Sequence, residues 1–330
     1  MTGIEKFAMG AGRSAYRGTI HVGLVNDMPD TALRATELQY ARLLKEASGA
    51  LDVQLRFFSL SQVVRGELAR SRMEGFYADA DTLPTAGIDA LIVTGAEPCG
   101  ADLPVEGYRD ALTRLVDWAE IGTISSVFSC PAAHAAVLHR SGIAPLKLPR
   151  KLSGVFTAEC AGGHPLQTGM QARIQVPHSR RDTIAESDLV SQGYRILSRL
   201  SGGGVDSFAR TMPGRSLFLF LQGHPEYGAE TLGREYLRDM GRFLRGESDE
   251  RPAVPECYFD RATEYALAAL DASPRGSDDL EHHSGIISGA LPLQSWRSHT
   301  IKLFGNWLAL VAAEKMRRVA HPPARKKLRA

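Results

Sequence analysis

The sequence contains few cysteines and no long apolar run. Its four cysteines form no Cys-x-x-Cys pair, which argues against a disulfide framework and favours reduced thiols. No stretch approaches the roughly 18 apolar residues that a membrane-spanning helix needs. Residues 1–18 lack the apolar core of a signal peptide. We therefore expect a cytoplasmic protein with no membrane partner.

An excess of charge of one sign is also missing. The 330 residues include 39 Lys and Arg against 37 Asp and Glu, a formal net charge of +2. Seven of the basic residues but only one acidic residue lie beyond position 313, so the rest of the chain is mildly acidic, with 32 basic and 36 acidic residues. Such a surface is a poor match for a phosphate backbone. We expect no nucleic-acid partner.

Apolar runs alternate with helical patterns along most of the chain. Short runs that are apolar on both faces are typical of parallel strands, and their alternation with helices favours a doubly wound, mostly parallel α/β sheet with a C-terminal helical extension. Strands are expected at 19–25, 51–59, 88–94, 124–129 and 216–222, and helices at 31–47, 108–120, 131–139, 230–244, 261–270 and 303–318.

The same patterns divide the chain into three parts. We expect a flexible leader over 1–18, a single α/β domain over 19–318 and a basic, disordered tail over 319–330. Within the domain, residues from about 247 to 300 are rich in Pro, Gly, Ser and charge. This composition predicts a loop-rich region that packs on the sheet.

Cys130 lies where a predicted strand meets a predicted helix. Pro131 follows it and suits the first helical position, which needs no backbone donor. A thiol at this corner projects from the carboxyl edge of the sheet, at the positive end of a helix, where a nucleophilic thiolate is favoured. A small buried cysteine at a tight packing point is the structural alternative. Cys130 taken alone slightly favours this structural alternative.

His224 and Glu226 follow another predicted strand, in the sequence Gly-His-Pro-Glu-Tyr at 223–227. An imidazole at a strand end can take a proton from a thiol, and a carboxylate two residues later can orient its ring. With Cys130, these residues supply a nucleophile, a base and an orienting group. The three together predict an enzyme that uses a cysteine nucleophile.

The motifs around these residues resemble those of the homoserine O-acyltransferases, which have the class I glutamine amidotransferase-like fold, a flavodoxin-like doubly wound sheet. The resemblance spans roughly residues 19–312. It is carried by KLSGVF at 151–156, PHSR at 177–180, GHPEY at 223–227, EYLRD at 235–239 and SWRSH at 295–299.

The resemblance implies a ping-pong acyl transfer in methionine and sulfur amino-acid biosynthesis. Cys130 would take an acyl group from succinyl-CoA or acetyl-CoA as a thioester, and the hydroxyl of L-homoserine would then attack that thioester. His224 would be the general base and Glu226 its orienting partner. The resemblance further implies a homodimer with no metal and no permanently bound cofactor.

The resemblance also assigns residues to the substrates. Lys151 and Ser179 would contact substrate, and Arg238 would hold the carboxylate of the amino acid, which a guanidinium matches with two hydrogen bonds. Cys99 falls where succinyl-transferring members have Gly and acetyl-transferring members have Glu. Because Cys is small and neutral, it favours a succinyl group.

Pro131 departs from the family pattern, which has Trp after the nucleophile. The backbone N–H at this position normally helps to form the oxyanion hole, and proline has none. We therefore expect Gly95 and Ala96 to supply the oxyanion donors.

Other functions stay open at this stage. L-serine is one methylene shorter than homoserine, and a pocket alone discriminates by only about 1–3 kcal/mol. A glutaminase-like hydrolase could use the same three residues, although Phe128 and Ala132 stand at the glycine positions of its usual Gly-x-Cys-x-Gly elbow. A non-catalytic relative that binds an amino acid or acyl-CoA is the third possibility.

Overall fold

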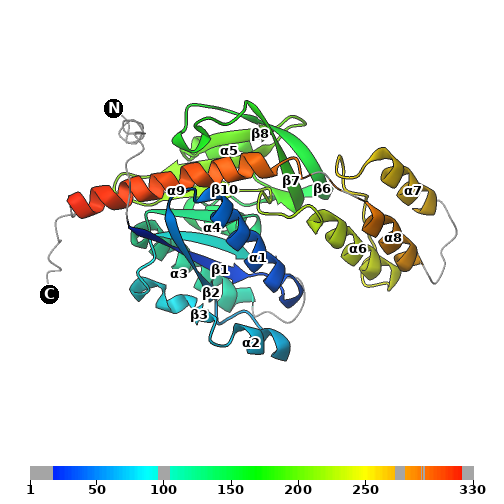
Figure 1. Ribbon diagram of the computed structural model, residues 1–330, viewed down its shortest axis with the longest axis horizontal. Coiled ribbons are helices and arrows are strands. Elements are labelled where there is room, and N and C mark those ends of the chain that lie inside the picture. Colours follow the sequence, from blue (N-terminus) through cyan, green and yellow to red (C-terminus); the bar gives the residue numbers. More distant parts are fainter. Residues whose placement is uncertain (1–17, 96–104, 272–278, 291, 293, 322–330) are drawn as a thin grey trace.

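The computed structural model describes residues 18–95, 105–271, 279–290, 292 and 294–321. A single sheet of ten strands runs through this part of the chain, in the order β3-β2-β1-β4-β5-β10-β9-β8-β6-β7 (Figure 1). The strands are β1 Thr19–Asp27, β2 Asp52–Ser59, β3 Tyr77–Asp79, β4 Ala90–Gly95, β5 Ser125–Ser129, β6 Leu146–Cys160, β7 Arg173–Thr183, β8 Arg195–Leu200, β9 Val205–Thr211 and β10 Leu217–Leu221.

The sheet has a parallel part and an antiparallel part. From β3 to β10 every neighbouring pair is parallel, and from β10 to β7 every pair is antiparallel. The predicted doubly wound, mostly parallel sheet is therefore confirmed. The antiparallel part, built from β6, β7, β8 and β9, was not predicted.

Helices cover both faces of the parallel part. The helices α1, Asp30–Ala47, and α9, Arg297–Ala320, pack side by side on one face (Figure 1). The helices α3, Val105–Gly122, and α4, Pro131–Ser141, cover the other face. The alternating side chains of β10 serve both layers, since Leu217, Leu219 and Leu221 face α9 while Phe218 and Phe220 face the α4 side.

The remaining helices lie outside these two layers. Three of them, α6, α7 and α8, gather at one end of the molecule around a core that includes Tyr236, Met240 and Trp296 (Figure 1). Their bounds are α6 Thr231–Leu244, α7 Arg261–Asp271 and α8 Asp279–Gly289, and the short helices are α2 Glu67–Met73, α5 Glu186–Ser191, η1 Ala80–Thr85 and η2 Pro165–Gln167. Within the described ranges, no helix is both long and apolar enough to cross a membrane.

The region from about 247 to 300 is more helical than its composition predicted. The expected helix is present as α7, but α8 follows it, and α9 begins at Arg297 rather than at 303. The apolar residues of α8 are few and are interrupted by glycine and histidine, so its sequence carries little helical periodicity. Packing against α6 and α7 stabilises it instead.

Gly154 holds the segment after α6 against the sheet. Its φ of 149° favours glycine, and the backbone around it is bridged to Glu256: Val155 N–H donates to the Glu256 carbonyl at 2.8 Å, and Glu256 N–H donates to the Ser153 carbonyl at 2.9 Å. A Cβ on Gly154 would lie 2.3 Å from that Glu256 carbonyl oxygen. The close approach therefore requires glycine at this position.

We predict that Gly154→Ala destabilises the protein by about 2–4 kcal/mol, because it adds both backbone strain and a steric clash. Urea or thermal unfolding measures the change. The matched control is Gly202→Ala, an exposed position where an added Cβ meets nothing within 4 Å. A Gly154 variant as stable as this control would contradict the assigned packing.

Candidate active site

Cys130 occupies a strained corner between β5 and α4. Its φ of 50° and ψ of −111° are unusual for a residue with a side chain, and Cys257 is the only other non-glycine residue with positive φ in the described ranges. Hydrogen bonds fix the corner: Cys130 N–H donates to the Leu221 carbonyl at 2.8 Å, and the Cys130 carbonyl accepts from His134 N–H at 3.2 Å. Strain of this kind concentrates at functional sites. The structure thus places Cys130 at the predicted elbow, nearly buried at 5% exposed.

His224 and Glu226 lie beside Cys130 because β10 and β5 are parallel neighbours, with Leu221 paired to Ser129. The Cys130 thiol lies close enough to the His224 imidazole to influence its pKa. Its Nδ1 lies 2.9 Å from Glu226 Oε1. Both side chains are buried. The structure therefore brings the three predicted catalytic residues together.

The surroundings of His224 favour its charged form. Burial alone would lower the pKa of His224, but its interactions with Cys130 and Glu226, including the hydrogen bond to Glu226, outweigh it and raise this pKa well above its ordinary value. A buried charge is tolerated where it is paired and hydrogen-bonded. The site is thus arranged so that His224 can carry a positive charge between Cys130 and Glu226.

Tyr40 of α1 faces the far side of this group. Its hydroxyl points toward Glu226 and Ser129, and burial and the charge of Glu226 raise the pKa of Tyr40 well above its ordinary value. The Tyr40 hydroxyl, the Ser129 hydroxyl and Glu226 Oε2 are buried, yet none makes a hydrogen bond of normal geometry among the described residues. Sequence analysis missed Tyr40, which fits the apolar face of its helix.

A second polar cluster joins Lys151 of β6 to α6. Lys151 Nζ lies 2.8 Å from Asp239 Oδ2 and 3.9 Å from Glu235 Oε2. The guanidinium of Arg238 lies 2.8 Å from Asp239 Oδ1 and is half exposed. Burial would raise the pKa of Asp239, but Lys151 and Arg238 hold it below its ordinary value. The two cations that the sequence assigned to substrate are thus brought together, through Asp239.

Tyr227 connects the two clusters, and sequence analysis gave it no role. Its ring stacks on the His224 imidazole, with centroids 4.4 Å apart and planes inclined by 16°. Its hydroxyl donates to Glu235 Oε1 at 2.8 Å. Tyr227 lies in the motif GHPEY and Glu235 in the motif EYLRD. These motifs were the signal in the sequence that could have pointed to the two residues.

The structure defines the positions of the other predicted site residues less fully. Gly95 ends β4, and extending the pairing of Val93 with Phe128 by two positions brings it level with Cys130. Ser179 lies half-buried on β7, opposite Ser153, and is not hydrogen-bonded to either cluster in the part of the chain described. The predicted oxyanion residue Ala96 and the predicted specificity residue Cys99 lie outside the described residues.

Arg180 brings a buried positive charge close to the nucleophile. Its Nε donates to His178 Nδ1 at 3.2 Å and its Nη1 to the Asp182 carbonyl at 2.6 Å. Burial lowers the pKa of Arg180, and attraction to Cys130 partly offsets this. Pro131 is at the first position of α4 and has no N–H to offer an oxyanion. Arg180 lies in the PHSR motif but was not predicted to face Cys130.

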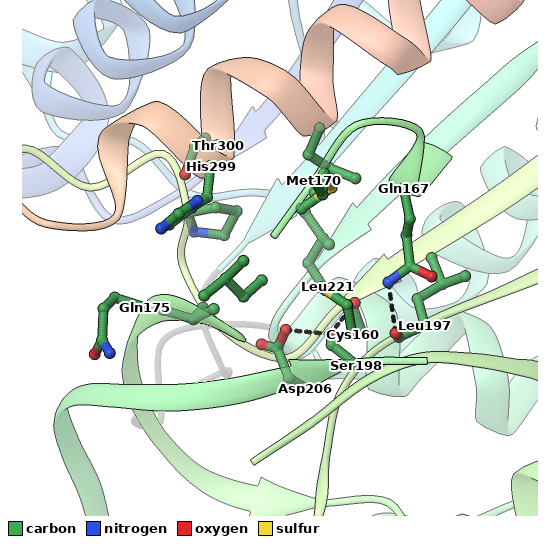
Figure 2. A pocket seen from close by; sticks show the side chains of 15 residues that line it. Cys160, Gln167, Met170, Gln175, Leu197, Ser198, Asp206, Leu221, His299 and Thr300 are labelled. Carbon is green, nitrogen blue, oxygen red and sulfur yellow. Dashed lines mark hydrogen bonds between the residues drawn. The ribbon is translucent and has the colours of Figure 1, made fainter. Parts of the chain in front are cut away.

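A separate small hollow opens between the antiparallel strands and α9 (Figure 2). Cys160, Asp206 and His299 line it, and Asp206 accepts a hydrogen bond from Ser198 at 2.6 Å. Pro225 reaches it, but the three catalytic candidates do not. The described residues include no group of three or more His, Cys, Asp or Glu side chains placed to hold a metal ion.

Comparison with known proteins identifies the family. A family model described as homoserine O-succinyltransferase matches residues 7–317. The chain belongs to the homoserine O-succinyltransferase family. A protein named homoserine O-succinyltransferase from Rhodopseudomonas palustris is 46% identical over 310 residues, covering 92% of this chain and 91% of that protein. One from Bradyrhizobium japonicum is 43% identical over 293 residues, covering 88% and 90%.

Among solved structures, this family member is similar to two glutamine amidotransferases. The one from Thermotoga maritima is 9% identical, with a TM-score of 0.45 over 89% of this chain and 98% of that chain. The one from Methylobacillus flagellatus is 12% identical, with a TM-score of 0.45 over 88% and 94%. The predicted family and the predicted acyltransferase class are confirmed by the family match and the relatives.

We predict that Glu226→Gln lowers the pKa of His224, because it removes one of the two negative charges that raise this pKa. Nuclear magnetic resonance of isotope-labelled histidine measures the titration, with the His224 signal assigned by its loss in His224→Asn. Glu314→Gln, which neutralises a buried carboxylate of α9, is the control and should leave the titration unchanged. An unchanged His224 titration in the Glu226 variant would show that Glu226 does not set the charge of the base.

Proposed function

We propose that this enzyme transfers the succinyl group of succinyl-CoA to the hydroxyl of L-homoserine through a thioester on Cys130. The observation that carries the proposal is the buried contact of Cys130 with His224, which Glu226 orients at 2.9 Å. The arrangement supplies the nucleophile and the proton carrier that a two-step acyl transfer needs. The names of the relatives favour succinyl as the acyl group and homoserine as the acceptor.

In the first half-reaction, the Cys130 sulfur attacks the thioester carbonyl of succinyl-CoA. The carbon–sulfur bond to CoA breaks, and the departing CoA sulfur takes the proton of the His224 imidazolium. The acyl group stays on Cys130 and His224 is left neutral. That proton is the one His224 takes from the Cys130 thiol as the sulfur attacks, so none has to arrive from solvent.

In the second half-reaction, neutral His224 removes the proton from the homoserine hydroxyl as its oxygen attacks the acyl carbon. The bond to the Cys130 sulfur breaks, O-succinylhomoserine leaves, and the Cys130–His224 pair returns to its starting state. Glu226 keeps the imidazole facing Cys130 in both half-reactions.

Both tetrahedral intermediates carry an oxyanion that needs donors. We assign this role to the backbone of Gly95 and Ala96, because the residue after the nucleophile is Pro131. The register of β4 supports the assignment of Gly95, which is level with Cys130. The positive charge of Arg180 adds to the attraction for negative charge at this point.

The cluster of Lys151 and Arg238 with Glu235 and Asp239 suits the acceptor. An amino acid is a zwitterion, and this cluster offers charges of both signs. Half-exposed Arg238 can bind the α-carboxylate with two hydrogen bonds, and Lys151 and Ser179 complete the substrate contacts. Cys99, small and neutral, leaves room for the succinyl carboxylate.

The setting of the reaction follows from the same family resemblance. The enzyme would work in the cytoplasm as a homodimer, with succinyl-CoA as a co-substrate and no resident cofactor. Its product would enter methionine and sulfur amino-acid biosynthesis.

The proposal is tested by the intact mass of the protein after brief exposure to succinyl-CoA or acetyl-CoA. We predict a succinyl adduct that is absent from Cys130→Ala and that L-homoserine discharges at least about tenfold faster than L-serine, in line with the discrimination expected for one methylene. An adduct formed only from acetyl-CoA would identify acetyl-CoA, and not succinyl-CoA, as the donor. Discharge of the thioester by water alone would indicate a hydrolase. No adduct from either donor would overturn the mechanism and favour a binding protein.

A further inference from the structure

Tyr227 is held rigidly between the catalytic residues and the C-terminal motif SWRSH. Its carbonyl accepts hydrogen bonds from Trp296 Nε1 and Gln294 Nε2, both at 2.9 Å, and its N–H donates to the His224 carbonyl at 3.1 Å. The side chain is 5% exposed and belongs to the core around α6. Its position is therefore fixed at the backbone as well as at the ring.

The ring of Tyr227 restricts the motion of the general base. It lies nearly flat against His224, at 4.4 Å between centroids. A stacked aromatic face attracts a charged imidazolium and keeps water from one side of it. The stack thus preserves the orientation in which His224 meets both Glu226 and Cys130, and both half-reactions need that orientation.

The hydroxyl of Tyr227 acts on the other cluster. It donates to Glu235 Oε1 at 2.8 Å, while Glu235 Oε2 faces Lys151 at 3.9 Å and has no hydrogen bond among the described residues. Burial, followed by the charge of Glu235, raises the pKa of Tyr227 well above its ordinary value, so the hydroxyl stays protonated and remains a donor. One carboxylate oxygen of Glu235 is held by Tyr227, and the other faces Lys151 of the proposed acceptor site.

We infer that Tyr227 is a positioning residue that couples the general base to the acceptor pocket. Its ring serves both half-reactions through His224, and its hydroxyl serves only the second through Glu235. The inference rests on the proposed function, because it uses the two half-reactions and the acceptor site assigned above. A purely structural tyrosine would not separate the two steps.

The test measures the two half-reactions separately in three variants. Tyr227→Phe keeps the ring and removes only the hydroxyl, whereas Tyr227→Leu removes the stack as well. Tyr258→Phe is the matched control, since Tyr258 is a buried tyrosine of the same core whose hydroxyl donates to the Ala229 carbonyl and accepts from Gly233 N–H. Melting temperatures confirm that each variant is folded.

We expect Tyr227→Phe to form the thioester from succinyl-CoA within about twofold of the wild-type rate. Its discharge by homoserine should slow roughly 10-fold to 100-fold at low acceptor concentration, the size expected for a lost hydrogen bond to a charged group, with most of the loss in the KM for homoserine. Tyr227→Leu should slow both half-reactions, and Tyr258→Phe neither. If Tyr227→Leu does not fold, the comparison of Tyr227→Phe with Tyr258→Phe still decides the question.

Two outcomes would overturn the inference alone: normal discharge of the thioester in Tyr227→Phe, or an equal slowing of both half-reactions in that variant. A wild-type protein that forms no thioester would overturn the proposed function, and the coupling role would fall with it. The wild-type reaction therefore distinguishes the two failures.

Discussion

The contact between Cys130 and His224 is the interaction on which the rest of the site depends. It exists because β5 and β10 are adjacent parallel strands that end at the same edge of the sheet. The chain reverses sharply at each of these ends, into α4 after Cys130 and into the loop that carries Glu226 after His224. The backbone of Cys130 is strained in the conformation that directs its thiol toward the imidazole.

Burial makes the charges of this site depend on one another. A buried charge is stable only with a partner, and His224 has two, Cys130 and Glu226. Arg180 adds a further cation on the side of the nucleophile. Since Pro131 offers no N–H, the proposed stabilisation of the oxyanion relies on the end of β4 and on this cation instead of the start of the helix.

The sequence allowed the parallel part of the sheet except β3 to be predicted, as well as the approach of Cys130, His224 and Glu226 to one another. The run Leu217–Leu221 is apolar on both faces, and His224 follows it after two residues, while Cys130 directly follows the strand Ser125–Ser129. The antiparallel strands escaped prediction because they carry charge and proline, as in the RIQVPHSRRDT of β7, and so lack an apolar run. The helix α8 escaped for a similar reason, since it depends on neighbours rather than on its own periodicity.

Contacts between residues far apart in the sequence were the second feature that the sequence did not predict. Lys151 and Asp239 are separated by 88 positions, and only the antiparallel strands bring β6 alongside α6. Tyr40 and Tyr227 look like ordinary apolar residues of a helix face and a loop, and they acquire a role only beside Glu226 and His224. Candidate reactive residues can be predicted from their type and their position at a strand end, whereas the residues that orient them can be identified only in the folded structure.

The most direct test of the central claim, that Cys130 and His224 act as a nucleophile–base pair, is the amount of CoA released from succinyl-CoA when no acceptor is present. The account predicts a rapid release of about one equivalent per chain, the burst expected of a covalent intermediate. His224→Asn should lose most of this burst although it retains Cys130. Release of CoA only after homoserine is added would contradict the account, because it would mean direct transfer without a thioester on Cys130.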